Sequence, residues 1–145
     1  MNKLIGYTEI ETSDGKLPLK IGSYTLEHVC DSYGIGLAEI GTLFVTKEID
    51  LNGQKVSYET PKDIIKFLSL VIHHGVNYVA GINGTTQYPL EKAYEWIDEI
   101  GLSSQKSIDI IAAFMASIRN GGTPVKIGTD PKTVKKKAAN VAAVA

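Results

Sequence analysis

The residues best suited to chemistry in this chain are its three histidines and its one cysteine. His73 and His74 are adjacent, so on a helix their side chains point about 100° apart and do not converge on one metal ion. His28 and Asp31 have the i, i+3 spacing that metal-binding helices use, and Cys30 lies between them. No second pair of suitable spacing accompanies them in the sequence, so metal binding is not expected.

Nucleophilic catalysis by Cys30 with a distant histidine is the other chemical option. Cys30, however, falls on the apolar stripe of a predicted helix, where a free cysteine behaves as a small hydrophobic residue. The glycine pairs at 34–36 and 81–84 lack the strand and lysine of a phosphate-binding loop. The acidic residues around Trp96 fit a solvated helix face better than catalytic carboxylates; they are Glu91, Glu95, Asp98 and Glu99. We therefore expect no enzyme activity and no cofactor.

Two hairpins are expected in a chain that is otherwise mainly helical, within the α+β class. Residues 4–21 form two alternating segments around Asp14-Gly15, a dipeptide typical of a type I′ turn. A second small hairpin is expected at 45–58, around Asn52-Gly53. In the first hairpin, the alternation predicts that Leu17, Leu19 and Ile21 form a buried face. Glu9, Glu11 and Lys20 are expected on the opposite, solvent-exposed face.

Apolar residues at helical spacing predict five helices that pack as a compact bundle. Ser23 or Thr25 is the expected cap of the first helix and Gly34 its end, and Thr60-Pro61 begins the central core helix. The expected helices are 23–33, 37–44, 61–78, 89–100 and, capped by Ser103 or Ser104, 104–120. Their expected core residues are Leu26, Val29, Cys30, Tyr33, Leu37, Ile40, Leu43, Phe44, Ile64, Ile65, Leu68, Val71, Ile72, Val76, Leu90, Ala93, Tyr94, Trp96, Ile97, Ile108, Ile111, Ala112, Met115 and Ile118.

The composition is that of one globular domain, expected over residues 1–120, followed by a tail. The chain has 145 residues, of which 43% are hydrophobic and 21% charged. The longest apolar stretch, 64–80, is interrupted by polar residues and falls short of the roughly 20 residues of a membrane span. With no secretory signal in the sequence and a single cysteine, a cytoplasmic location is expected.

The expected flexible tail, residues 121–145, is rich in lysine and alanine. It carries five lysines against Asp130, whereas the other 120 residues carry ten basic and fifteen acidic side chains. Because the tail has neither arginine nor an aromatic residue, it resembles a solvated or partner-binding segment more than a nucleic-acid-binding arm.

Aromatic residues are the strongest indication of a binding surface. Seven tyrosines and Trp96 are many for this length, and tyrosine and tryptophan are enriched at protein contacts. We expect a groove between the 61–78 and 89–100 helices, with Tyr94 and Trp96 as its main contacts. The full set of expected partner-binding residues is His74, Tyr78, Tyr94, Trp96 and Ile97, with Lys135, Lys136 and Lys137 in the tail.

Four segments together resemble the small tail assembly chaperones of long-tailed bacteriophages and prophages. They are Pro18-Leu-Lys-Ile-Gly-Ser-Tyr-Thr-Leu-Glu27, Tyr33-Gly34-Ile35, the aliphatic helix with His74-Gly75, and Tyr94-Glu-Trp-Ile-Asp-Glu99. The resemblance implies a non-catalytic protein of the host cytoplasm that coats the long tape measure protein, keeps it soluble and recruits tail tube subunits. Self-association of the protein along that helix is also expected, because many weak sites would then act together. The Asn52-Gly53 hairpin and the tail depart from the family pattern.

Two other functions fit parts of the sequence. A structural virion protein, such as a tail completion or connector subunit, would assemble into a ring and remain in the particle. A small DNA-binding regulator would use the lysine tail and would lose its affinity as salt is raised. Such a regulator needs a basic recognition helix, and the last predicted helix carries only Lys106 and Arg119.

Overall fold

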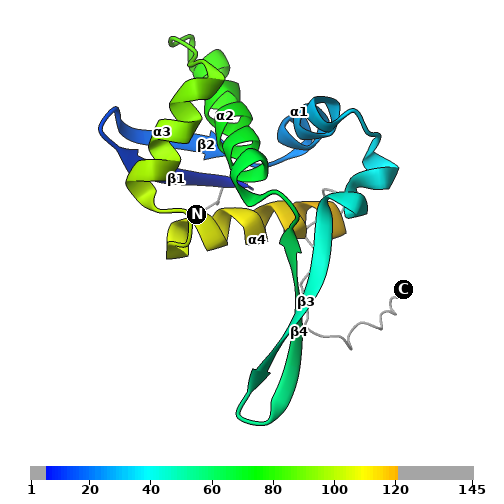
Figure 1. Ribbon diagram of the computed structural model, residues 1–145. Coiled ribbons are helices and arrows are strands. Elements are labelled where there is room, and N and C mark those ends of the chain that lie inside the picture. Colours follow the sequence, from blue (N-terminus) through cyan, green and yellow to red (C-terminus); the bar gives the residue numbers. More distant parts are fainter. Residues whose placement is uncertain (1–5, 121–145) are drawn as a thin grey trace. The chain divides into compact units, whose positions relative to one another are not determined.

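The computed structural model describes residues 6–120, which form a mixed α and β structure of two antiparallel hairpins and five helices (Figure 1). The expected α+β class is therefore confirmed. The expected tail, residues 121–145, lies outside the described residues. In chain order the elements are β1 (Tyr7–Thr12), β2 (Gly15–Lys20), α1 (Ser23–Tyr33), the 3-10 helix η1 (Leu37–Leu43), β3 (Phe44–Leu51), β4 (Gln54–Pro61), α2 (Ile64–Asn83), α3 (Leu90–Ile100) and α4 (Gln105–Asn120).

The chain divides into two compact units, Met1–Phe114 and Met115–Ala145. The first unit contains both hairpins, helices α1 to α3, η1 and the first ten residues of α4. The second unit contributes only the end of α4 to the described residues. Every site discussed below lies in the first unit.

The β1–β2 hairpin is confirmed, but its turn is not the predicted type I′. The pairing of Thr12 with Gly15 makes Ser13 and Asp14 the two loop residues, and both have negative φ. Gly15 instead takes the left-handed conformation, at φ +104°. This matches a type I turn followed by a left-handed glycine. The expected face of Leu17, Leu19 and Ile21 is buried, and Ile10 of β1 is buried with it.

The β3–β4 hairpin is confirmed and is longer than the expected 45–58. Asn52 and Gly53 have φ of +53° and +84°, as a type I′ turn requires. The strands continue to the pair Phe44 and Pro61. Pro61 therefore ends a strand, and α2 begins three residues later, at Ile64, with Asp63 as its cap.

Helix α2 is the core helix of the first unit, as expected, and it extends five residues beyond the predicted end at Tyr78. It contacts β2, α1 and α3, and Gly84 ends it in the left-handed conformation. It is long and apolar enough to cross a membrane, but 61% of its most apolar 18-residue stretch is buried inside the protein, as in the core helix of a soluble domain. Ile65, expected in the core, is 48% exposed.

Two expectations for α1 and η1 are wrong. The cap of α1 is Gly22, without a side-chain hydrogen bond. Thr25 is buried and donates to the carbonyl oxygen of Lys20 at 2.7 Å, so it ties the helix to β2. In η1, Leu37 is 60% exposed because only the middle of this short element reaches the core, at Ile40. Phe44 is buried as expected, but it belongs to β3.

The buried stripe of α4 differs from the predicted one. Within the first unit, Ser107, Ile110 and Phe114 are buried, whereas Ile108 is 52% exposed. The ring of Phe114 packs edge-on against Phe67 at 4.8 Å, and the hydroxyl of Ser107 donates to the carbonyl of Gly101. These contacts rotate the helix by about one residue from the predicted register. Ser104, one of the two residues expected to cap α4, does so by accepting a hydrogen bond from the N–H of Ser107.

Candidate functional site

The expected partner-binding residues of α3 divide into buried and exposed side chains. Trp96 has no exposed surface and Ile97 is almost completely buried, whereas Tyr94 is 40% exposed. Trp96 is therefore a core residue in this structure and is not placed to contact a partner. Tyr94, expected in both the core and the groove, lies at the surface.

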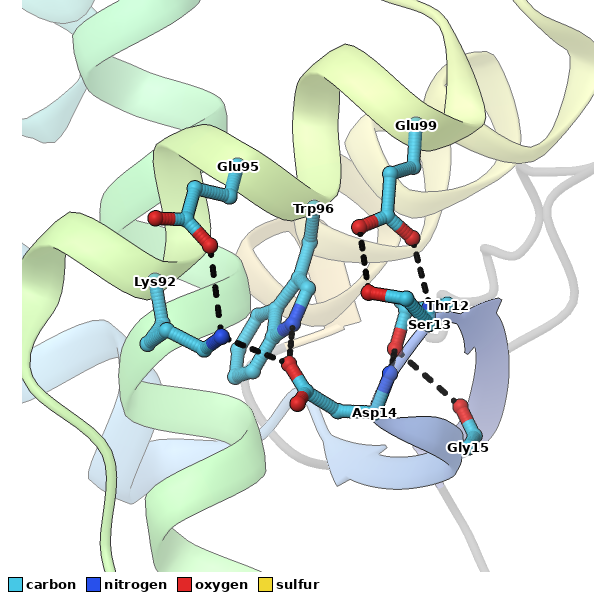
Figure 2. Close-up of polar contacts among 8 residues, drawn as sticks. All are labelled: Thr12, Ser13, Asp14, Gly15, Lys92, Glu95, Trp96 and Glu99. Carbon is cyan, nitrogen blue, oxygen red and sulfur yellow. Dashed lines mark hydrogen bonds and ion pairs between the residues drawn. The ribbon is translucent and has the colours of Figure 1, made fainter.

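The burial of Trp96 is completed by a hydrogen bond to the β1–β2 turn (Figure 2). Its indole Nε1 donates to Asp14 Oδ2 at 2.8 Å, and Lys92 Nζ lies 2.9 Å from the same oxygen. The indole hydrogen bond first, and then the contacts of Lys92, lower the pKa of Asp14 below its ordinary value. The hydrogen bond to Asp14 and the one to Glu95 raise the pKa of Lys92. The turn and α3 are thus joined by a charge-assisted network.

A second contact fixes the same turn at the next turn of α3. Glu99 accepts hydrogen bonds from the backbone N–H and the hydroxyl of Ser13, the latter at 2.8 Å. Thr12 closes the turn by accepting from the N–H of Asp14 and donating to the carbonyl of Gly15. Two of the acids that the sequence assigned to a solvated face, Glu95 and Glu99, therefore hold structure together.

A shallow groove of about 350 Å³ lies between α2 and α3, where the sequence analysis placed the binding site. Tyr94 and Ile97 come from α3, and the exposed Ile65 comes from α2. Its lining combines apolar side chains with the polar groups of Tyr94 and Asp98. The lining residues are Ile65, Tyr94, Ile97, Asp98, Gly101 and Leu102.

The end of helix α1 contacts Lys66, the residue of α2 that follows Ile65. The ammonium of Lys66 lies 4.5 Å from the centre of the Tyr33 ring, in the geometry of a cation–π contact. Burial, together with the charges of Asp63 and Tyr94, raises the pKa of Tyr33 to about 12.

Tyr78 and His74 are not in the groove. They lie in a cluster of rings between α1 and α2, where Tyr24 stacks on His28 at 4.0 Å and contacts Tyr78 at 5.1 Å. His74 lies 5.1 Å from His28 and 4.9 Å from His73. Burial, and then the two neighbouring histidines, lower the pKa of His74 to about 4. The structure therefore separates these two residues from Tyr94, although the sequence grouped them together.

His73 has a structural role with Asn77. His73 Nε2 and Asn77 Nδ2 both lie 2.9 Å from the carbonyl oxygen of Tyr88, and Asn77 Oδ1 accepts from the N–H of Tyr88 at 2.9 Å. This geometry places the imidazole proton on Nε2. The other nitrogen, Nδ1, is buried without a hydrogen-bond partner.

The remaining candidates from the sequence are Cys30, a metal site and the lysines of the tail. Cys30 is buried, and burial followed by the charge of Asp31 raises the pKa of its thiol. Within residues 6–120, no three His, Cys, Asp or Glu side chains gather in a way that would hold a metal ion. Lys135, Lys136 and Lys137 lie outside the described residues.

The groove contains residues that the sequence analysis did not assign to it. Ile65 was placed in the core because α2 is apolar on several faces, and helical periodicity could not show which face stays uncovered. Leu102 belongs to the loop after α3, where no periodic pattern applies.

Comparison of the chain with protein family models, curated proteins and solved structures gives no match.

Proposed function

We propose that this protein is a tail assembly chaperone of a long-tailed phage or prophage, a non-catalytic protein that binds helical segments of the tape measure protein and helps to recruit tail tube subunits. The observation that carries the proposal is the groove between α2 and α3, where the exposed side chains of Ile65 and Tyr94 lie beside Asp98. The sequence resemblance supplies the identity of the partner.

The groove suits an amphipathic helix. Such a helix places apolar side chains at i, i+3, i+4 and i+7 into a groove formed by two helices. A tape measure protein is a long helix with repeated apolar faces, which aggregates until the tail tube surrounds it. A shallow groove binds each segment weakly, and many copies along one helix provide avidity while every copy stays removable.

The rigid support of the groove favours binding without large rearrangement. Ile97 is anchored in the core beside Trp96, which is held by Asp14. The compact helical bundle expected from the sequence would in this proposal act as the frame that keeps α2 and α3 at a fixed spacing. Release in the host cytoplasm would then depend on competition by tube subunits.

Co-expression with the tape measure protein of the same phage or prophage, followed by affinity capture and mass measurement, tests the proposal. We expect many copies of the chaperone on one soluble tape measure protein. Ile65→Asp should abolish capture, because it places a charge in the groove. Ile82→Asp is the matched control, since Ile82 is an exposed isoleucine of the same helix, at 60%, that does not line the groove.

Two results would contradict the proposal. One is capture that Ile65→Asp and Tyr94→Ala leave unchanged in folded variants. The other is the presence of the protein as a ring in purified virions, which would make it a structural component of the tail.

A further inference from the structure

The groove between α2 and α3 combines three kinds of side chain. Tyr94, Ile97 and Asp98 have the i, i+3, i+4 spacing, so they lie on the same side of α3. Ile65 of α2 and Leu102 add to the aliphatic part of the lining. An aromatic ring, a carboxylate and aliphatic groups therefore share one groove of about 350 Å³. A long basic side chain, which has an aliphatic stem and a charged end, fits this combination.

Asp98 is the carboxylate of this lining, and it is exposed and unpaired. No hydrogen bond or ion pair joins its side chain to any residue that the structure describes. Its two acidic neighbours on α3 are paired (Figure 2). Glu95 Oε1 lies 3.2 Å from Lys92 Nζ. Glu99 accepts hydrogen bonds from the N–H and the hydroxyl of Ser13. Asp98 is therefore the acid in this half of the helix that is available to a partner.

The C-terminal end of α3 adds to the negative charge of the groove. The last turn of this helix contains Asp98 and Glu99 and no basic residue. Carboxylates are unfavourable at a helix C-terminus, where the helix dipole favours cations. A positive charge beside Asp98 would therefore be stabilised by the carboxylate and by the end of the helix. The groove is complementary to a cation as well as to apolar side chains.

The Tyr94 ring and the Asp98 carboxylate are neighbours, because the two residues lie one turn apart on α3. A cationic side chain that crosses the ring can reach Asp98 and gain a cation–π contact with Tyr94. A contact of the same kind exists nearby, where the ammonium of Lys66 lies 4.5 Å from the centre of the Tyr33 ring. Lys66 follows Ile65 on α2, but its ammonium makes no ion pair with Asp98. The charge of Asp98 is thus left for a partner to neutralise.

We propose that the groove binds its helical partner through an arginine side chain that lies over the Tyr94 ring and pairs with Asp98. The aliphatic stem of this arginine packs against Ile65 and Leu102. A guanidinium stacks on aromatic rings and forms two parallel hydrogen bonds to a carboxylate. Arginine therefore suits this pair of residues better than lysine, whose ammonium is a compact point charge.

This inference rests on the proposed function for the helical nature of the partner, and it adds which segments of that partner are selected. A selected segment carries an arginine next to its apolar stripe. A segment with a neutral residue at that place binds more weakly, and one with an acidic residue is rejected, because its charge faces the carboxylate of Asp98.

Calorimetric titration of the full chain with designed peptides tests the arginine contact. The probe is an alanine-based helical peptide with leucines at i, i+3, i+4 and i+7 and one arginine next to that stripe, at i+8. Reference peptides carry lysine, glutamine or glutamate in place of the arginine. We expect the glutamine peptide to bind about tenfold more weakly than the arginine peptide. The lysine peptide should lie between these two, and the glutamate peptide should be the weakest.

Variants of Asp98 show whether this residue reads the charge. Asp98→Asn should weaken the arginine peptide about tenfold and leave the glutamine peptide unchanged. Asp98→Arg should prefer the glutamate peptide. Glu91→Gln is the matched control, because Glu91 is an exposed acid of the same helix that does not line the groove. Asp98→Asn should fold and should melt at the same temperature as the wild type or a higher one, since it removes a carboxylate from the helix C-terminus.

A variant of Tyr94 tests the ring. Tyr94→Leu keeps an apolar side chain in the groove and removes the aromatic face, so it should weaken the arginine peptide more than the glutamine peptide. Equal binding of the four peptides to the wild type would overturn the arginine contact and leave the groove as a helix-binding site. A loss in Asp98→Asn that the arginine and glutamine peptides share would do the same. If no peptide binds, or if Ile65→Asp leaves binding unchanged, both the arginine contact and the groove of the proposed function are contradicted.

Discussion

Trp96 Nε1 donates a hydrogen bond to Asp14 Oδ2 at 2.8 Å, although the two residues are 82 positions apart in the chain. The contact joins the first turn of the protein to the helix that forms one wall of the groove. Trp96 is completely buried, whereas Asp14 lies in an exposed turn. The turn therefore supplies the hydrogen-bond acceptor that the buried indole N–H needs.

Variants at these two positions should separate the packing of the indole from its hydrogen bond. Trp96→Ala removes the largest fully buried side chain and should lower the free energy of unfolding by about 3–5 kcal/mol. Trp96→Phe keeps part of the ring volume but loses the donor, so it should cost less. Asp14→Asn should also destabilise, because it removes the charge that Lys92 contacts. Urea unfolding followed by circular dichroism measures all three, and equal stability of Trp96→Phe and wild type would show that the hydrogen bond contributes nothing.

The stability of the protein should fall between pH 6.5 and 4 because of His74. Its pKa is about 4 in the folded protein, lowered by burial and then by His73 and His28, against an ordinary value of 6.5. The unfolded chain therefore binds this proton first, so the contribution of neutral His74 is complete above pH 6.5 and is lost as the pH falls toward 4. The loss is at most about 3 kcal/mol. Unfolding of His74→Gln across this range should show a smaller slope, and an identical slope would contradict the assignment.

Local patterns predicted the elements better than they predicted the contacts between them. The Asn52-Gly53 turn and the left-handed Gly34 follow from φ preferences of single residues, and both are as predicted. The register of α4 is set by the packing of Phe114 on Phe67, 47 residues away in the chain, and an amphipathic pattern with many apolar positions does not determine it.

A pocket lies where the sequence predicted a groove, but of the predicted residues in the described part of the chain only Tyr94 and Ile97 line it. The groove lies between the two helices expected, because the spacing of apolar residues identified both α2 and α3. Trp96 was expected both in the core and in the groove, because tryptophan is common at interfaces, and it lies on the buried face of α3 with Ala93 and Ile97. The partner of its indole, Asp14, could not be found from spacing, since turn acids have no periodic relation to a distant helix.

Asn77 should be required for the loop between α2 and α3. Its side chain donates to the carbonyl and accepts from the N–H of Tyr88, each at 2.9 Å. Asn77→Ala leaves the N–H of Tyr88 without this partner and should cost about 1–3 kcal/mol. Because the ring of Tyr88 contacts Trp96 at 5.0 Å, the tryptophan fluorescence of the folded variant should also change. Unchanged stability and unchanged fluorescence would contradict this role.

Two glycines of α2 should respond oppositely to the same substitution. A methyl group at Gly75 would lie 3.0 Å from both Leu19 Cδ1 and the carbonyl oxygen of Lys20, so Gly75→Ala must push α2 away from β2. We expect it to cost about 1–3 kcal/mol through overpacking. At Gly81, the nearest atom is Nε2 at the end of the exposed Gln87 side chain at 3.2 Å, which can shift at the expense of its 3.3 Å hydrogen bond to the carbonyl oxygen of Asn77. Gly81→Ala should therefore stabilise the protein by up to about 1 kcal/mol, because alanine favours a helix over glycine. Thermal unfolding of the two variants measures the difference, and a similar loss in both would show that the close approach of α2 to β2 does not limit the residue at position 75.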